Sequence, residues 1–518
     1  MKKTAAVLLA AMTVLTGCGE RGVSRSESSV TSDSSSAADT DKQGDDIVLT
    51  IGVVAGGTEI MDGNGSVTKC YFWGPMQELI DRFNSKDNGI RIEIKNYAES
   101  EEFKDFGYDE HGSFQGYKDD ELKMIDFQVA QDLINKDDID IVGTNTFANS
   151  AKYEIFKRKG GFADLYEFMK DDPEVNSDTL NKHILELNER DGKLYSIPLC
   201  YTARTLIGES QYVGTKRNWS IDEFIDCWNR MPEGSTVTYS NEAEVVYYDV
   251  LRANTTAFID YVSCKTRFDD PDFRKMLEFC KQFPSNMGIK KDGGINYTDP
   301  QLVKLTMLTG YGNAILGETD YSDYSRKYCR IRDGSHTLVG FPTSDGKGAF
   351  LCGAYGEWSI RSNISKEKQQ AAWTFLRELY TEGFQTDNYA IRHESNDPQT
   401  GETFVNYEFM QGFPVNNAAR KNIAQNLLGG KYDDATDIQT IQGNEVTEEN
   451  KLALEQEDID YIDEYIDSID RWEFPDTDRE LFWIIEDEVL AYFHGEQDVD
   501  TVVDHVQDRA GIWLSEQA

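Results

Sequence analysis

The feature that most constrains the fold is an alternation of strand and helix patterns that begins at residue 47. Residues 47–54 form a continuous apolar run, typical of a strand buried on both faces, and residues 90–94 alternate as a second strand. Between them a helix is predicted to open at Pro75, and a second helical pattern covers residues 125–133. A third strand follows at residues 139–142. This βαβαβ order predicts a parallel sheet with crossover helices.

The C-terminal part of the chain is predicted to be helical. Apolar residues recur at helical spacing in residues 371–380 and again in residues 499–514. The stretch between them is strongly acidic over residues 433–470, yet Ile459 and Ile462 keep the helical spacing. We therefore interpret this stretch as a helix with a solvated acidic face, in preference to an acidic binding tail.

The charge balance excludes one class of partner. The 518 residues contain 93 Asp and Glu against 52 Lys and Arg, a formal net charge of −41. A surface of this sign repels phosphate backbones, so we expect no nucleic-acid binding. With 39% hydrophobic and 12% aromatic residues, the chain still has enough apolar material for packed cores in two or more domains.

The first eighteen residues resemble a bacterial lipoprotein signal. Lys2 and Lys3 precede a short apolar run, and Leu15-Thr16-Gly17-Cys18 closes it with small residues. The resemblance implies a signal peptide over residues 1–17 and lipid on Cys18, with the protein anchored to the extracytoplasmic face of the cell membrane. The alternative is an ordinary secretory signal with an incidental cysteine. The apolar run is too short for a permanent membrane span.

The residues after this signal are predicted to form a flexible tether. Residues 18–46 are rich in serine and almost lack apolar side chains, so they cannot bury enough surface to offset chain entropy. Seven cysteines remain beyond Cys18, with no Cys-x-x-Cys pair, and the six histidines show no metal-ligand spacing. We expect at least one free thiol, no disulfide scaffold, no metal site and no cofactor.

Short stretches along the chain match one family's motifs in order and spacing. They are Asp140-Ile141-Val142, Gly161-Phe162-Ala163-Asp164-Leu165, and residues 192–198, 219–224, 339–343, 355–360, 366–379, 412–416 and 488–510. Each stretch alone is weak, but together they cover nearly everything after the tether. The chain resembles the extracellular solute-binding proteins of ABC importers, the family that includes the maltose-binding proteins.

The resemblance implies a fold and a function. The fold is the two-lobed, type II periplasmic-binding-protein fold of the α/β class, in which each lobe has a mixed or parallel sheet flanked by helices. Lobe one is expected to comprise residues 47–146 plus 352–416, and lobe two residues 147–351 plus 417–518. The protein is expected to be a monomer that captures a small solute, most plausibly a sugar or oligosaccharide, between its lobes and delivers it to the membrane subunits of the permease. The loops at residues 56–72 and 97–120 are longer than the family pattern.

A sugar site combines aromatic platforms with paired polar groups, because sugars present flat C–H faces and many hydroxyls. Trp358 is predicted to be such a platform, with Tyr355 and Glu357 beside it, since these residues lie where the chain should return across the hinge. The alternative is that Trp358 is a core residue beneath the strand.

Other candidates lie where strands are expected to end. Trp73 follows the loop after the first strand, although it could equally belong to a helix cap. Asn145 and Thr146 follow the third strand. The remaining candidate ligand-binding residues are Tyr201, Arg204, Glu318, Asp320 and Tyr321. For all of them the alternative is an ordinary surface-loop residue.

Two other classes of function stay open at this point. A surface-anchored glycoside hydrolase needs two carboxylates across a cleft, and with 93 acidic residues a suitable pair is uninformative. No Gly-x-Ser-x-Gly, His-Glu-x-x-His or phosphate-loop motif is present. A surface adhesin is typically built from repeated short strands, whereas this chain mixes helices and strands. We therefore predict a binding protein without catalytic residues.

Overall fold

The computed structural model describes residues 46–54, 58–61, 67–70, 74–86, 88–108, 116–135, 139–148, 150–260, 263–285, 300–320, 325–396, 403–431, 452–472 and 479–516. Residues 46–518 belong to one unit, which is described by itself. The predicted signal peptide, Cys18 and nearly all of the tether lie outside the described residues. Among the helices that the structure describes, none is both long and apolar enough to cross a membrane.

A mixed sheet of eight strands forms the centre of the fold, in the order β11-β8-β15-β5-β1-β4, with β14 and β18 also paired to β8. β1 (Ile47–Val53) runs parallel to β4 (Ile90–Asn96) and to β5 (Ile141–Gly143). The predicted parallel βαβαβ unit is thus confirmed. β15 (Phe350–Ile360) is antiparallel to both β5 and β8 (Ile197–Glu209). β8 also pairs with β11 (Lys304–Leu308), β14 (His336–Leu338) and β18 (Phe413–Pro414), all antiparallel.

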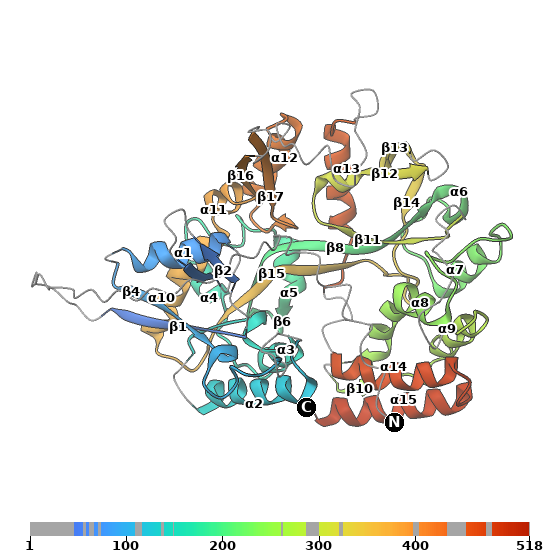
Figure 1. The fold of residues 1–518 in the computed structure, drawn as a ribbon, viewed down its shortest axis with the longest axis horizontal. Coiled ribbons are helices and arrows are strands. Elements are labelled where there is room, and N and C mark those ends of the chain that lie inside the picture. Colours follow the sequence, from blue (N-terminus) through green and yellow to red (C-terminus); the bar gives the residue numbers. More distant parts are fainter. Residues whose placement is uncertain are drawn as a thin grey trace, which may run out of the picture. The chain divides into compact units, whose positions relative to one another are not determined.

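Helices and five small hairpins surround this sheet (Figure 1). The hairpins are β2/β3 (Thr58–Met61, Val67–Cys70), β6/β7 (Glu189–Arg190, Lys193–Leu194), β9/β10 (Ile259–Asp260, Lys265–Thr266), β12/β13 (Ile315–Asp320, Ser325–Arg330) and β16/β17 (Ala390–Asn396, Thr403–Phe409). The helices are α1 (Gly74–Asn84), α2 (Asp119–Asn135), α3 (Ser150–Arg158), α4 (Tyr166–Met169), α5 (Lys182–Asn188), α6 (Ser210–Val213), α7 (Ile221–Trp228), α8 (Ala243–Val246), α9 (Pro271–Lys281), α10 (Lys366–Leu376), α11 (Glu382–Asp387), α12 (Asn417–Leu428), α13 (Gln456–Asp467), α14 (Arg479–Phe493) and α15 (Val499–Glu516).

Local sequence signals account for several of these elements. α1 begins at Gly74, directly before Pro75, and buries the apolar face that the sequence predicts. α7 begins after Ser220, whose side chain accepts a hydrogen bond from the backbone of Glu223 while the Glu223 carboxylate accepts one from the backbone of Ser220. This reciprocal capping box satisfies two backbone donors at the start of the helix.

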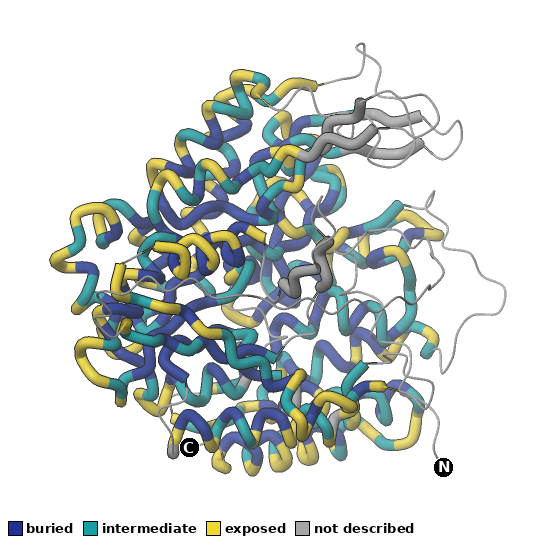
Figure 2. The backbone as a smooth tube through the Cα atoms, turned by 60° about the vertical axis from the view of Figure 1, so that its left-hand side comes forward, coloured by how far each residue is buried: buried dark blue, intermediate teal, exposed yellow. Residues whose placement is uncertain are grey.

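The described part of the chain has two large apolar cores. Figure 2 shows the buried residues in dark blue along the backbone. One core includes β1, β4, α1, α10 and α13, and the other includes α7, α9, α14 and α15. β8 and β15 contribute to both, because Tyr201 and Leu351 belong to the first core while Leu206 and Phe350 belong to the second. These two strands therefore connect the cores, and Figure 1 shows them crossing between the two groups of elements. The lobe boundaries given above stay a prediction.

β15 is interrupted by a bulge between Ala354 and Glu357, where its register to β8 shifts. Tyr355 has a φ of 59° and Gly356 a φ of 89°, both in the left-handed region. This conformation is costly for a tyrosine, and such outliers persist only where the surroundings compensate. The bulge thus marks a point of strain in one of the two strands that join the cores.

Candidate functional site

The carboxyl ends of β1 and β5 meet at one edge of the sheet. The backbone N–H of Val54 donates to the carbonyl of Asn145 at 2.9 Å. The hydroxyl of Thr146 donates to the carbonyl of Gly52 at 2.6 Å and accepts from the N–H of Gly143 at 2.8 Å. Thr146 is fully buried, so it holds the two strand ends together and presents no group to a ligand in this structure.

Asn145 differs from its neighbour. The residue is half-buried, and its side-chain oxygen Oδ1 is shielded from solvent without a hydrogen-bond partner among the described residues. A Cβ added at Gly143 would lie 2.7 Å from this oxygen and 2.7 Å from Cζ3 of Trp358, so the amide lies close to the indole. A shielded carbonyl oxygen without a donor is costly, and a donor from a bound molecule would satisfy it.

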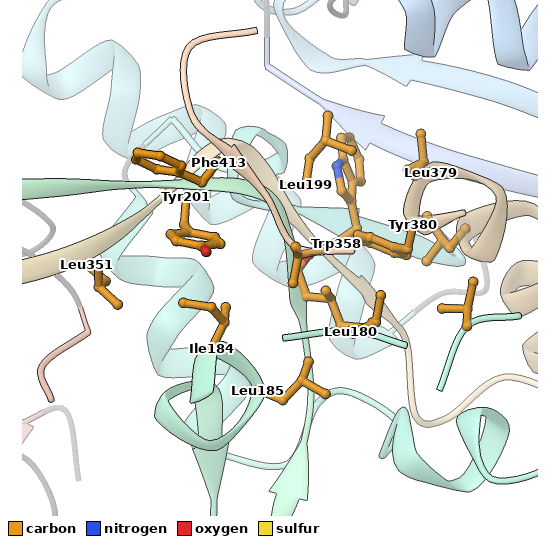
Figure 3. Packing of buried hydrophobic residues seen from close by; sticks show 14 of the residues in the cluster. Leu180, Ile184, Leu185, Leu199, Tyr201, Leu351, Trp358, Leu379, Tyr380 and Phe413 are labelled. Carbon is orange, nitrogen blue, oxygen red and sulfur yellow. Dashed lines mark hydrogen bonds between the residues drawn. The ribbon is translucent and has the colours of Figure 1, made fainter. Parts of the chain in front are cut away.

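Trp358 lies in the core and is 1% exposed. It belongs to the first apolar core, where Figure 3 shows it packed among Leu180, Leu199 and Tyr380. A stacking platform needs an exposed ring face, which Trp358 does not offer here. The alternative interpretation, a core tryptophan, describes its surroundings, and the prediction of a platform at this position is corrected accordingly.

Glu357 is also buried, within a cluster of polar side chains. Its carboxylate accepts hydrogen bonds from Ser196 at 2.7 Å, from the indole of Trp472 at 3.1 Å and from the ammonium of Lys157 at 3.2 Å. Lys157, on α3, is 1% exposed and also contacts Glu154 at 3.3 Å. Burial alone would raise the pKa of Glu357, but the charge of Lys157 and the three hydrogen bonds outweigh it and hold this pKa below its ordinary value.

The Glu357 cluster therefore has a structural task. The carboxylate is buried and its three donors all belong to the protein, so the predicted direct contact with a solute is not what the geometry offers. The cluster instead joins β15 to α3 through Lys157 and to the segment after α13 through Trp472. A backbone hydrogen bond supports the second connection, since the N–H of Leu351 donates to the carbonyl of Arg471 at 2.8 Å.

Tyr355 is the half-buried member of the predicted trio. Its hydroxyl accepts a hydrogen bond from the backbone N–H of Gln411 at 3.1 Å, and its ring packs beside the small apolar cluster of Cys200, Tyr389, Met410 and Ile423. Burial raises the pKa of its hydroxyl. Tyr355 is thus an aromatic side chain that is partly accessible on the strained part of β15.

Tyr201 is fully buried and belongs to a second polar network. Its hydroxyl accepts hydrogen bonds from Arg420 at 2.6 Å and Asn181 at 3.3 Å, and burial raises its pKa to about 12. Arg420 also donates to Tyr311 at 3.0 Å and to Asp463. The network ties β8 to α12 and α13, so Tyr201 supports the sheet and offers no exposed ring to a solute.

Arg204 lies in a strip that the sequence reasoning found only in part. Cross-strand pairing places Arg204 opposite Met307 of β11 and Phe350 of β15, hence on one face of the sheet. Alternation adds Leu305 and Cys352 to the same face. Leu305 and Met307 are exposed and Arg204 and Cys352 are half-buried. We call Arg204, Leu305, Met307 and Cys352 the central strip. Leu305 and Met307 alternate in the sequence, but their exposure is seen only in the structure.

A further aromatic group was missed by the sequence reasoning. Tyr239 is exposed, and the nearby Asp249 lies on a one-turn π-helix, Tyr247–Leu251. Burial raises the pKa of Asp249 to about 6, against the lowering effect of Arg252. π-helical turns are frequent at functional sites, and the sequence reasoning did not predict this one.

The remaining predicted residues cannot be placed by their side chains. Trp73 and Tyr321 lie outside the described residues. Glu318 and Asp320 lie on β12, opposite Lys327 and Ser325 of β13, and only their backbone is described.

A surface hollow of about 400 Å³ lies away from all of these residues. It is lined by α4, α5 and neighbouring segments, and its lysines already contact glutamates, as Lys170 does with Glu167 and Lys182 with Glu186. Among the described side chains, no group of three or more His, Cys, Asp and Glu is arranged to hold a metal ion. Of the cysteines in the described part, Cys200, Cys227 and Cys280 are buried thiols, which agrees with the expectation of at least one free thiol.

Comparison with solved structures places the fold. The chain is similar to a periplasmic oligogalacturonide binding protein from Yersinia enterocolitica, with 12% identity, a TM-score of 0.50, and coverage of 91% of this chain and 100% of that one. It is equally similar to a de novo designed cysteine esterase, with 13% identity, a TM-score of 0.50, and coverage of 91% and 98%. The sugar-binding protein MalE from Xanthomonas citri matches with 10% identity, a TM-score of 0.47, and coverage of 91% and 98%.

No family model and no curated protein matches the sequence. At these identities the structural likeness defines the fold. The chain has the α/β fold of the two-lobed periplasmic binding proteins, with a central mixed sheet flanked by helices. The resemblance to the extracellular solute-binding proteins of ABC importers is confirmed at the level of the fold.

Proposed function

We propose that this chain is the lipid-anchored solute-binding component of an ABC importer, which captures a sugar or oligosaccharide and delivers it to a permease. The observation that carries the proposal is the pair of long strands β8 and β15, which joins two separate apolar cores and contains a strained bulge at Tyr355. Such a connection supports a hinge between two bodies that hold a ligand between them.

Three half-buried side chains near this connection, Asn145, Tyr355 and Arg204, suit a sugar. Asn145 has a shielded oxygen without a donor, and a sugar hydroxyl is a donor. Tyr355 supplies a partly accessible ring, and Arg204 of the central strip lies on β8, opposite Phe350 of β15, with exposed apolar neighbours on β11. Apolar surface with a few fixed polar groups is the usual composition of a small-molecule site.

The first test identifies the solute. The full chain is purified without denaturation, and the small molecules released on unfolding are analysed by mass spectrometry. We expect a carbohydrate in near-stoichiometric amount. Calorimetric titration of the emptied protein with that molecule should then give saturable binding without chemical change. Saturable turnover of the molecule by the purified chain would contradict a binding protein and indicate an enzyme.

A matched pair of variants tests the site. Asn145→Ala should weaken binding about fivefold or more, since one hydrogen bond contributes about 1 kcal/mol. Asn422→Ala removes a half-buried amide of α12 that pairs with Glu382, and should leave the affinity unchanged. Equal affinity in both folded variants would place the site elsewhere.

A further inference from the structure

A third segment of the chain connects the two apolar cores. Helix α13 buries Ile466 in the first core, whereas α14 buries Leu481 in the second core. The chain therefore crosses from one core to the other between these helices, and the structure describes residues 470–472 of this crossing. Trp472 forms an isolated parallel bridge with Leu351. The crossing thus runs beside β15, one of the two strands that join the cores.

Trp472 fixes the crossing on the side of the first core. Its ring packs against that core, and its indole N–H donates to Glu357 at 3.1 Å. Glu357 is buried and is itself bound by Lys157 of α3 at 3.2 Å. This end of the crossing is therefore held by a buried carboxylate.

The two residues before Trp472 grip the loop between β14 and β15. The carboxylate of Asp470 pairs with Lys347, and the guanidinium of Arg471 pairs with Asp345. Arg471 also lies over the ring of Phe350, a residue of the second core, at 5.6 Å from the ring centre. We call Asp345, Lys347, Asp470 and Arg471 the clasp.

The loop that the clasp grips is itself fixed to the second core. The Thr343 hydroxyl donates to Oδ1 of Asp345 at 2.9 Å, while Oδ2 binds Arg471. The backbone N–H of Ser344 donates to the side chain of Asn254 at 2.9 Å, and Asn254 is fully buried in a segment of the second core. A loop held in this way loses little further freedom when its charges pair, so these pairs can contribute more than isolated surface pairs.

The clasp and Trp472 therefore bind the same short segment to different cores. A movement of one core relative to the other strains the clasp or the Trp472 contact. The clasp is the part that salt can weaken, because Lys347, Asp470 and Asp345 have side chains that are 55%, 50% and 42% exposed. Dissolved ions screen exposed charges over about 10 Å at 0.1 M and about 3 Å at 1 M, and they screen buried pairs much less.

We infer that the clasp is an ionic latch that holds the two cores in the arrangement of this structure and loosens as the salt concentration rises. The inference rests on the proposed function, in which the two cores move about a hinge, and it adds a dependence of that hinge on ionic strength. The latch shifts the equilibrium between arrangements because its ion pairs differ between them.

Single-molecule fluorescence energy transfer on the full chain tests the latch. Bio-orthogonal amino acids for dye coupling replace Glu78 on α1 of the first core and Ile512 on α15 of the second, both of which are exposed. Between about 0.1 M and about 1 M sodium chloride, the ratio of the populations with different core separations should change about threefold or more. An unchanged distribution at the two salt concentrations would overturn the inference without any further variant.

Variants of the clasp locate the effect. Arg471→Gln should show the high-salt distribution already at about 0.1 M salt. The matched control, Arg274→Gln, removes an ion pair between α9 and α15 within the second core and should behave as the parent protein does. An Arg471→Gln protein with the parent's low-salt distribution, or one that responds to salt as strongly as the parent, would overturn the inference.

A second clasp variant guards against a local effect of the first. Asp345→Asn retains an oxygen that can accept the hydrogen bond from Thr343, and it should reproduce the Arg471→Gln distribution. The double variant should add nothing further, because both changes remove the same pair, and additive effects would contradict the latch. Titration with the carbohydrate released from the purified chain separates the two proposals. A chain that binds this solute while its core separation ignores salt contradicts only the latch, and a chain that binds no solute contradicts the proposed function.

Discussion

Replacing Lys157 by methionine should destabilise the protein more than any surface charge change. Lys157 is 1% exposed, and its ammonium lies 3.2 Å from Glu357 and 3.3 Å from Glu154. Methionine retains much of the side-chain volume but leaves the buried carboxylate of Glu357 without its cation. Removing one member of a buried ion pair typically costs about 3 to 5 kcal/mol, and we expect a loss in this range at pH 7.

The loss should depend on pH in a defined direction. In the wild type, Lys157 holds the pKa of Glu357 below its ordinary value, so the ionised carboxylate contributes stability that is lost as the pH falls through that lowered pKa. In Lys157→Met, burial is opposed only by the hydrogen bonds from Ser196 and Trp472, and the pKa should rise. The variant's carboxylate then becomes protonated at moderately acidic pH. The difference in stability between variant and wild type should therefore be smaller at pH 4.5 than at pH 7.

Urea unfolding followed by tryptophan fluorescence measures the effect at both pH values. Lys170→Met is the matched control, because Lys170 is exposed and its contact with Glu167 lies on the surface. We expect no measurable change in the control. A Lys157→Met protein that unfolds within 1 kcal/mol of the wild type, or whose deficit grows at low pH, would refute the assignment of a buried, stabilising ion pair.

Four further predictions concern the anchor, the core, titration and motion. Cys18→Ser should release the chain from the membrane fraction after a high-salt wash, and retention would contradict lipid anchoring. Trp358→Ala should lower the free energy of unfolding by about 3 to 5 kcal/mol through cavity formation. Thermal unfolding and solute titration on the same sample measure this effect. An unchanged melting point with weakened binding would instead support the interpretation of Trp358 as a stacking platform for the solute. Asp249→Asn should raise the melting temperature at pH 7.5, because the folded-state pKa of about 6 exceeds the ordinary value of 3.8 and the buried charge is destabilising above it. This advantage should vanish as the pH falls from 6 towards 4, and a pH-independent difference would argue against the raised pKa. Saturating solute should reduce the radius of gyration measured by X-ray scattering, and identical values would count against closure.

Local patterns allowed much of the fold to be predicted. The apolar run of β1, the opening of α1 at Pro75 and the short strand β5 all form where periodicity and capping indicate. These features depend on neighbouring residues, so the sequence contains the information directly. The acidic stretch likewise contains α13, whose Ile459, Ile462 and Ile466 are buried.

The site was less predictable because its contacts join distant positions. Lys157 and Glu357 are 200 residues apart, and neither local sequence indicates that the two residues form a pair. The sequence predicted Glu357 to be an accessible polar residue beside two aromatic residues. In the structure, burial and three hydrogen-bond donors from the protein give it a structural role.

The bulge explains why a positional argument selected Trp358 for the wrong environment. In a regular strand successive side chains alternate between faces, so one extra residue changes which side chains share a face. Here the register shifts between Ala354 and Glu357, and Tyr355 and Gly356 take left-handed conformations. Trp358 is thereby paired with Gly143, whose missing side chain leaves room for the indole, since a Cβ there would lie 2.7 Å from the ring. The residue left beside the strained turn is Tyr355. We therefore expect Tyr355, and not Trp358, to supply any aromatic contact between β15 and a solute, while Trp358 anchors this strand in the core.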